Sequence, residues 1–213
     1  NKVKKAYLLA DKEQKALPLK ASYNKKTGHY RLKIDLPHTA PDKVVSVVVL
    51  EFEGSPEVET TICQQADQTI LLPGVSGEAS KDNKPSELKF TARGGGADWR
   101  DAAISLTWNF TVEKAGTYQI DLVTTETGSH GSPVWQGGQK LKIRCAGQFQ
   151  ETTVAADSKE YNQRSQYWKL IHTSAGKIKF EKPGTYELSL IPENFGENKT
   201  GFTFKEIQLN HIK

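Results

Sequence analysis

Two of the tryptophans in this 213-residue chain follow stretches that are rich in glycine or polar residues, where a ring can meet a ligand. Trp99 follows the glycine-rich stretch 92–98, and Trp135 follows the stretch 127–134 and precedes two glycines. An aromatic ring can stack on one face of a sugar while polar groups hydrogen-bond the sugar hydroxyls. The sequence therefore predicts Trp99 and Trp135 as platforms for a glycan. The alternative for both rings is packing into the fold.

Polar residues beside these tryptophans and in a later loop are candidates for the groups that bind sugar hydroxyls: Asp98, His130, Glu193 and Asn194. Loops held by a rigid scaffold often carry binding residues. The stretch 192–201 (PENFGENKTG), which contains Glu193 and Asn194, is expected to be a loop between the last two strands. Trp108 and Trp168 are predicted to be structural, since Trp108 lies on the apolar register of a strand and Trp168 can pack onto the same fold.

No catalytic motif accompanies these residues. The sequence has no G-x-S-x-G, H-E-x-x-H or Walker motif, and its histidines have no metal-ligand spacing. The stretch 92–98 precedes an expected strand rather than a helix, so it lacks the setting of a phosphate-binding loop. We therefore expect no catalytic residue, no bound metal and no cofactor.

Charge and hydropathy argue against a nucleic-acid-binding protein and against a membrane-spanning one. The net charge is +4, and the basic excess gathers near the start of the sequence without a nucleic-acid reader motif. No apolar run is long enough to cross a membrane, and the first residues lack a signal-peptide pattern. The basic excess is expected to be a solvated face.

Apolar and polar residues alternate along much of the chain, which is typical of strands with one buried face. The clearest alternating stretches are 29–37, 104–112, 118–123, 140–145, 186–191 and 202–209. A β-branched run at 44–54 adds a further expected strand. No stretch shows a convincing helical period. The pattern predicts an all-β fold, either a sandwich or a jelly roll.

One phrase occurs twice, as EKAGTYQIDL at 113–122 and as EKPGTYELSL at 181–190. In both copies an apolar residue ends one strand, a turn with a glycine follows, and a tyrosine opens the next strand. Glycine provides backbone angles that a Cβ would penalise. Because the flanking sequences differ, the echo predicts a recurrent turn, with one hairpin in each of two facing sheets, rather than a duplication.

The two cysteines, Cys63 and Cys145, fit no metal motif. Cys145 ends an alternating run, which favours a buried strand thiol over a disulfide. Cys63 is expected to lie in a linker, so that no bridge joins the two.

The second part of the chain resembles the jelly-roll carbohydrate-binding modules of families 6 and 35, on the stretches 99–123, 134–148, 177–192 and 201–209. The resemblance covers about residues 66–213 and implies a galactose-binding-like sandwich that binds glycans. Where family 6 modules often carry a sugar-contacting asparagine, this chain has Phe202, Thr203 and Phe204. The usual sugar site is therefore not carried over whole. Glu78 is a poor match for the structural calcium ligand of those modules, so a structural calcium has no support.

The first part, on the stretches 6–20 and 30–58, resembles the C-terminal β-sandwich of the family 29 glycoside hydrolases, the α-L-fucosidases. The resemblance spans about residues 3–58. Pro37 and Pro41 begin a rigid turn there, in which the Asp42 side chain can hold its own backbone. A complete sandwich needs more strands, which indicates that this sequence starts inside a longer protein. We expect one domain at 1–62 and another at 66–213.

Together the resemblances imply the non-catalytic C-terminal region of an α-L-fucosidase-like glycoside hydrolase, with a module that binds glycans, including fucose-containing ones. A barrel of roughly 250 residues would carry the catalysis, and the chain has no room for it. Two alternatives remain open: purely structural domains that brace such a barrel, or a protein-interaction or adhesion module. The resemblance further implies an upstream catalytic barrel as partner and a periplasmic, cell-surface or extracellular location.

Overall fold

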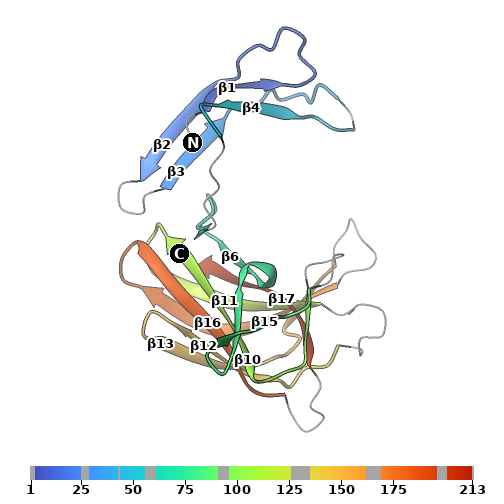
Figure 1. Cartoon of the computed structure of the whole chain (residues 1–213), viewed down its shortest axis with the longest axis vertical. Coiled ribbons are helices and arrows are strands. Elements are labelled where there is room, and N and C mark those ends of the chain that lie inside the picture. Colours follow the sequence, from blue (N-terminus) through green and yellow to red (C-terminus); the bar gives the residue numbers. More distant parts are fainter. Residues whose placement is uncertain are drawn as a thin grey trace. The chain divides into compact units, whose positions relative to one another are not determined.

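The computed structural model describes residues 3–24, 29–42, 44–55, 61–90, 96–125, 135–161, 169–195 and 201–212. Within these ranges the chain is built of strands, with one short 3-10 turn at Gly74–Ser76, which confirms the predicted all-β class. It forms two compact units, Asn1–Thr60 and Thr61–Lys213 (Figure 1). No helix in the described part of the chain is long and apolar enough to span a membrane.

The first unit contains two small sheets. Strand β1 (Val3–Leu8) pairs with β4 (Val48–Phe52), and β2 (Leu19–Asn24) pairs with β3 (His29–Ile34), both antiparallel. Among its described apolar side chains only Ala6 is fully buried. Large apolar side chains instead reach solvent, namely Leu9, Leu32, Leu36, Val44, Val45 and Val47. The described side chains of this unit therefore form almost no buried core.

The strand expected over 44–54 begins later than the sequence predicts, at Val48. The Asp42 carboxylate accepts hydrogen bonds from the backbone N–H groups of Val44 and Val45, at 2.7 and 3.2 Å. These bonds close the predicted side-chain turn and lower the pKa of Asp42. They also hold the backbone out of the sheet, which leaves Val44 90% exposed.

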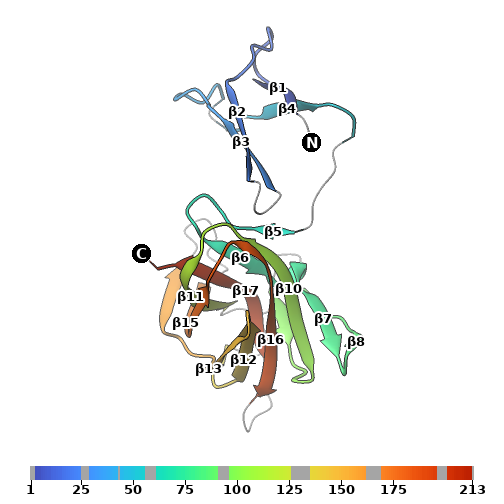
Figure 2. The same ribbon diagram turned by 90° about the vertical axis from the view of Figure 1, so that its left-hand side faces the viewer.

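The second unit is a sandwich of two sheets (Figures 1 and 2). Sheet one has the order β13-β12-β16-β10-β7-β8, with β5 also on β10, and sheet two has the order β14-β15-β11-β17-β6, with β9 also on β17. The strands are β5 (Ile62–Cys63), β6 (Ile70–Pro73), β7 (Glu78–Lys81), β8 (Lys84–Pro85), β9 (Ala97–Trp99), β10 (Ile104–Val112), β11 (Gly116–Thr125), β12 (Lys140–Cys145), β13 (Gln148–Thr153), β14 (Ser158–Tyr161), β15 (Lys169–Phe180), β16 (Gly184–Asn194) and β17 (Phe202–His211).

The first strand of this unit lies where the sequence predicts a linker. Strand β5 pairs in parallel with β10, so that Ile62 lies opposite Phe110 and Cys63 opposite Thr111. The described fold therefore assigns Ile62 to the second unit, whereas the predicted first domain ended at that residue. A two-residue strand is too short to show an alternating pattern, which explains why the sequence gives no signal for it.

The core lies between the two sheets and is rich in aromatic rings. Phe180 packs edge-on against Phe110 and Tyr118, with ring centroids 5.9 and 5.3 Å away. Trp108 is 1% exposed, as its register predicts, and its Nε1 donates to the carbonyl of Pro73 at 2.8 Å. The alternating stretches thus supply the inward faces of both sheets.

Both copies of the repeated phrase form the same hydrogen bond, from a tyrosine hydroxyl to a backbone carbonyl in the turn. In the first copy the Tyr118 hydroxyl donates to the carbonyl of Lys114 at 2.7 Å, and in the second the Tyr186 hydroxyl donates to the carbonyl of Lys182 at 2.6 Å. Each turn joins a strand of one sheet to a strand of the other, since β10 and β16 share sheet one and β11 and β15 share sheet two. The expectation of two hairpins within sheets is therefore wrong. The echo marks two arches between the sheets.

The glycines of the two arches differ. Gly116 has φ +148°, and a Cβ there would lie 2.5 Å from His211 Nε2, so this position needs glycine. Gly184 has an ordinary φ and only a distant ring atom near its Cβ direction. The expected backbone requirement therefore holds at Gly116 and not at Gly184, since only Gly116 has a positive φ.

Both cysteines are free, as predicted, with Cys145 buried and Cys63 partly exposed. Burial, followed by the negative charge of Glu187, raises the pKa of the Cys145 thiol to about 12. Since the thiolate is the reactive form of cysteine, both the burial and the raised pKa of Cys145 make it unreactive. We expect a thiol reagent to modify Cys63 first in the native protein, as followed by mass spectrometry. Cys63→Ser should remove the fast phase, and a fast phase that survives in this variant would contradict the assignment.

Candidate functional site

The ends of several strands meet at the end of the second unit that lies away from the two arches. Thr125 of β11 lies opposite Leu170 of β15, and Thr124 lies opposite Phe204 of β17. Phe202 of the same strand pairs with Trp99 of β9. This end of the sandwich, which we call the strand-end site, carries most of the predicted ligand-binding residues that the structure describes.

Trp135 is anchored here by its nitrogen. Its Nε1 donates to the hydroxyl of Thr124 at 2.9 Å, and that hydroxyl donates in turn to the carbonyl of Ile171 at 3.2 Å. Thr124 has no exposed surface, whereas Trp135 is partly exposed and packs against the core from outside. A ring held at one edge and partly open to solvent is suited to stacking on a sugar.

The two glycines after Trp135 are explained by what surrounds them. A Cβ on Gly137 would lie 2.5 Å from the carbonyl oxygen of Val154 and 3.2 Å from the Trp135 ring, so no larger residue fits there without movement. Gly138 has φ +101°, which also favours glycine, and its N–H donates to the same Val154 carbonyl at 2.8 Å. These contacts fix the backbone that presents the ring.

Trp99 does not have the exposure that the sequence predicts. Its side chain is 0% exposed, stacked on Phe202 with ring centroids 5.4 Å apart and edge-on to Phe204 at 5.7 Å. The prediction of Trp99 as a glycan platform is therefore wrong, and the alternative that the sequence left open, packing into the fold, holds at this position. The short strand β9 pairs with β17, and this pairing turns the ring into the core, so that it has no face open to a sugar.

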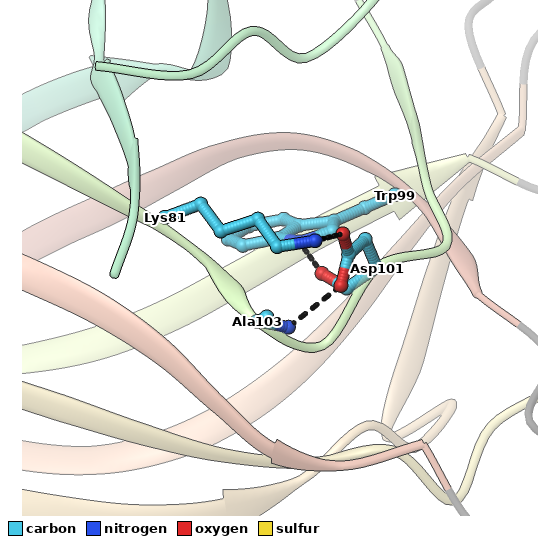
Figure 3. Close-up of polar contacts among 4 residues, drawn as sticks. All are labelled: Lys81, Trp99, Asp101 and Ala103. Carbon is cyan, nitrogen blue, oxygen red and sulfur yellow. Dashed lines mark hydrogen bonds and ion pairs between the residues drawn. The ribbon is translucent and has the colours of Figure 1, made fainter. Parts of the chain in front are cut away.

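The turn after Trp99 is held by Asp101 (Figure 3). The Trp99 Nε1 donates to the Asp101 carbonyl at 3.1 Å, while the Asp101 carboxylate accepts from Lys81 Nζ at 2.8 Å and from the Ala103 N–H at 2.9 Å. The bond from Lys81 and then the bond from Ala103 lower the pKa of Asp101. This arrangement makes Asp101 a structural residue of the turn and connects Trp99 to strand β7.

The polar candidates divide into three groups. Asp98 is partly exposed and pairs with Arg100 at 2.7 Å. Glu193 and Asn194 are exposed, but they end strand β16 instead of lying in a loop as expected. Glu193 binds Lys142 Nζ at 3.0 Å, and this bond, followed by one to Glu151, raises the pKa of Lys142. His130, like Trp168, lies outside the described residues.

Sequence reasoning missed the buried polar side chains that support this end. Gln139 is 1% exposed, and its Nε2 donates to the carbonyls of Gln136 and Gly201 at 3.0 and 3.2 Å. Thr124 and Thr125 are equally buried. The only signal in the sequence was the pair of threonines at the end of an apolar strand. Gln139 could not be found, because one of the two carbonyls that accept from it belongs to Gly201, 62 positions away along the chain.

The described side chains of the strand-end site do not form a metal-binding cluster. No group of three or more His, Cys, Asp or Glu side chains that could hold an ion occurs among the residues whose placement is described. Glu78, the poor match for a calcium ligand, lies on strand β7 opposite Thr107. Asp98 and Glu193, the candidate carboxylates that the structure describes at the strand-end site, are paired with Arg100 and Lys142.

No protein-family model and no curated protein sequence match the chain. Among solved structures, an α-L-fucosidase from Vibrio sp. strain EJY3 matches 99% of this chain and 34% of its own, with 24% identity and a TM-score of 0.62. Over nearly its whole length, the chain shares the fold of part of this α-L-fucosidase. The chain spans about a third of the length of that fucosidase, and the resemblance predicted from the sequence is confirmed at the level of fold.

Two carbohydrate-active proteins match the chain less closely. A GH26-CBM35 β-(1,4)-mannanase from Podospora anserina matches 69% of this chain and 28% of its own, with 12% identity and a TM-score of 0.41. A family 35 carbohydrate-binding module from an environmental isolate matches 65% of this chain and 90% of its own, with 16% identity and a TM-score of 0.38.

Proposed function

We propose that this chain is a non-catalytic region of an α-L-fucosidase-like glycoside hydrolase and that its second unit binds glycans. The observation that carries the proposal is the fold match to a fucosidase over 99% of this chain but only 34% of that protein. The remainder of such a protein has room for a catalytic barrel, and a barrel upstream of this chain would be its main partner. A periplasmic, cell-surface or extracellular location accompanies this role.

The strand-end site offers a way to hold a sugar. Trp135 would stack a face of its ring on the C–H groups of a pyranose, because the hydroxyl of Thr124 holds the ring at its Nε1 edge. The carboxylate of Asp98 can accept hydrogen bonds from neighbouring hydroxyls, while Arg100 donates to ring or hydroxyl oxygens. We propose Glu193, Asn194 and His130 as further contacts. Trp99 then acts as the buried support behind Asp98.

The proposal is tested with Trp135→Ala. Aromatic stacking on a flat ligand is worth about 1–3 kcal/mol for nucleic-acid bases. A pyranose offers C–H groups, so we place the loss near the lower end, which is about fivefold in affinity. A glycan array that includes fucosylated glycans selects a ligand for the unaltered chain, and calorimetry then compares the two proteins on it.

Two controls make the result specific. Trp135→Phe keeps a ring but loses the bond to Thr124, so it should bind with intermediate affinity. The thermal unfolding midpoint of both variants should stay close to that of the unaltered chain. If the array shows no glycan bound, the glycan-binding role is refuted and the bracing role is favoured. If Trp135→Ala binds the selected glycan unchanged, the strand-end site is wrong.

A further inference from the structure

The segment that enters the second unit is fastened to it through one buried polar side chain. Strand β5 pairs with β10 over only two residues, Ile62 and Cys63, so its backbone pairing contributes little (Figure 2). The next residue, Gln64, is 3% exposed, and its backbone N–H donates to the carbonyl of Thr111 at 3.2 Å. A buried glutamine needs partners for its amide, because an unpaired polar group in the interior is costly.

The Gln64 amide uses its full hydrogen-bonding capacity. Its Nε2 donates to the carbonyl of Gln68 at 2.8 Å and to the hydroxyl of Tyr118 at 2.6 Å. Its Oε1 accepts from the N–H groups of Glu113 and Lys114, both at 2.9 Å. An amide has two donors and two acceptor lone pairs, so this set is complete. Since Glu113, Lys114 and Tyr118 belong to the first arch, Gln64 ties the entering segment to the connection between the two sheets.

The turn after Gln64 is held in a conformation that a residue with a side chain disfavours. Gln68 has φ +75°, in the left-handed region that favours glycine. Its N–H donates to the carbonyl of Gln65 at 3.0 Å, and its Oε1 accepts from Lys114 Nζ at 2.9 Å. A non-glycine residue keeps this conformation when its surroundings impose it. The bonds to Gln64 and Lys114 impose it here, so the turn relaxes when they break.

Residues 61–69 have no fully buried apolar side chain. Gln64 is the one buried residue of this range, and Ile62, which packs against the core, is partly exposed. The core begins at Ile70, the first residue of β6, which is 0% exposed. Detachment of residues 61–69 would therefore break hydrogen bonds without emptying the core. Such an opening costs much less free energy than global unfolding.

The second arch lacks this arrangement. It repeats the bond from the tyrosine hydroxyl to the turn, from Tyr186 to the carbonyl of Lys182. Among the residues whose placement is described, no side chain hydrogen-bonds the N–H groups of Glu181 and Lys182 in the way that Gln64 binds the first arch. The shared phrase therefore explains the tyrosine bond, whereas the seat for Gln64 is specific to the first arch.

We propose that residues 61–69 form a releasable strap, which Gln64 docks on the first arch and which sets the length of the connection between the two units. The boundary between the units falls at the start of this strap, between Thr60 and Thr61. Release of the strap as far as Ile70 adds about 30 Å of extended chain to the connection. The length of a connection governs the effective concentration of one unit at a ligand of the other. The strap thus limits the reach of the second unit, and this inference does not depend on glycan binding.

Amide hydrogen exchange of the whole, unaltered chain tests whether the strap opens on its own. The N–H groups of Gln64, Glu113 and Lys114 should exchange at least about tenfold faster, relative to their intrinsic rates, than those of the central strand β11. Equal protection of the two sets would overturn the inference, because residues 61–69 would then detach only when the whole unit unfolds.

The variant Gln64→Leu removes the side-chain bonds at similar volume and should release the strap. Cys63 is the reporter, and its reaction with a thiol reagent should become about tenfold faster or more, since several hydrogen bonds are lost. Gln64→Glu keeps the acceptor for Glu113 and Lys114 but loses both donors, so its rate should be intermediate. Small-angle scattering should give Gln64→Leu a larger maximum dimension than the unaltered chain, while the amide signals of β11 stay in place.

The matched control is Gln65→Leu, the same change at the neighbouring position, where the side chain is exposed. It should leave the Cys63 rate and the maximum dimension unchanged. The inference is overturned if Gln65→Leu accelerates Cys63 as much as Gln64→Leu does, or if Gln64→Leu changes neither quantity. If Gln64→Leu does not fold, the exchange rates of the unaltered chain decide.

Discussion

Trp99→Ala is expected to lower the free energy of unfolding of the second unit by about 3–5 kcal/mol, as large core deletions do. Trp99 is 0% exposed and packs against Phe202 and Phe204. Its backbone also touches Gly201, where any Cβ would collide with the Trp99 carbonyl, so the surroundings have little freedom to collapse into the cavity. The loss should therefore lie toward the upper end of the range.

Urea unfolding followed by tryptophan fluorescence measures this loss. All four tryptophans belong to the second unit, so the signal reports on that unit. Trp99→Phe keeps most of the ring contacts but gives up the bond to the Asp101 carbonyl, and it should lose clearly less stability than Trp99→Ala. A midpoint for Trp99→Ala equal to that of Trp135→Ala would show that Trp99 is not a core residue.

The strands of the second unit could be predicted because a period of two is a local signal. The stretches around Trp108, Tyr118 and Leu188 alternate, and each is buried on the expected face. The pairing of strands is not a local property. The echo of EK-x-GTY therefore predicted the turns and the tyrosines correctly but assigned the turns to hairpins, since one sequence cannot show that β10 pairs with β16 and not with β11.

The candidate site was harder to predict for the same reason. Trp99 and Trp135 lie in similar stretches of sequence. Strand β9 pairs with β17 and buries the Trp99 ring, whereas Trp135 donates a hydrogen bond to Thr124 and stays partly exposed. Only the three-dimensional register distinguishes them.

The second large predicted effect concerns Cys145, whose thiol makes the free energy of unfolding depend on pH. Burial raises the pKa of its thiol from 9.0 to about 12 in the folded protein. Above the unfolded value, the unfolded chain releases this proton while the folded chain keeps it. The unfolded state then binds fewer protons, so the free energy of unfolding falls as the pH rises. The loss begins near the unfolded pKa and continues to the folded one.

We expect this single thiol to remove about 1.4 kcal/mol of stability for each pH unit above its unfolded pKa. Tyr118, whose pKa burial also raises, acts in the same direction, so the contribution of Cys145 must be isolated. Cys145→Ala provides the comparison. It should be less stable than the unaltered chain near neutral pH, because it leaves a cavity, but its stability should fall less steeply with pH.

Urea unfolding of both proteins from about pH 8 to about pH 10 measures the two slopes. Equal slopes would mean that Cys145 ionises as readily in the folded chain as in the unfolded one, and its assignment to a dry position in the core would then be wrong.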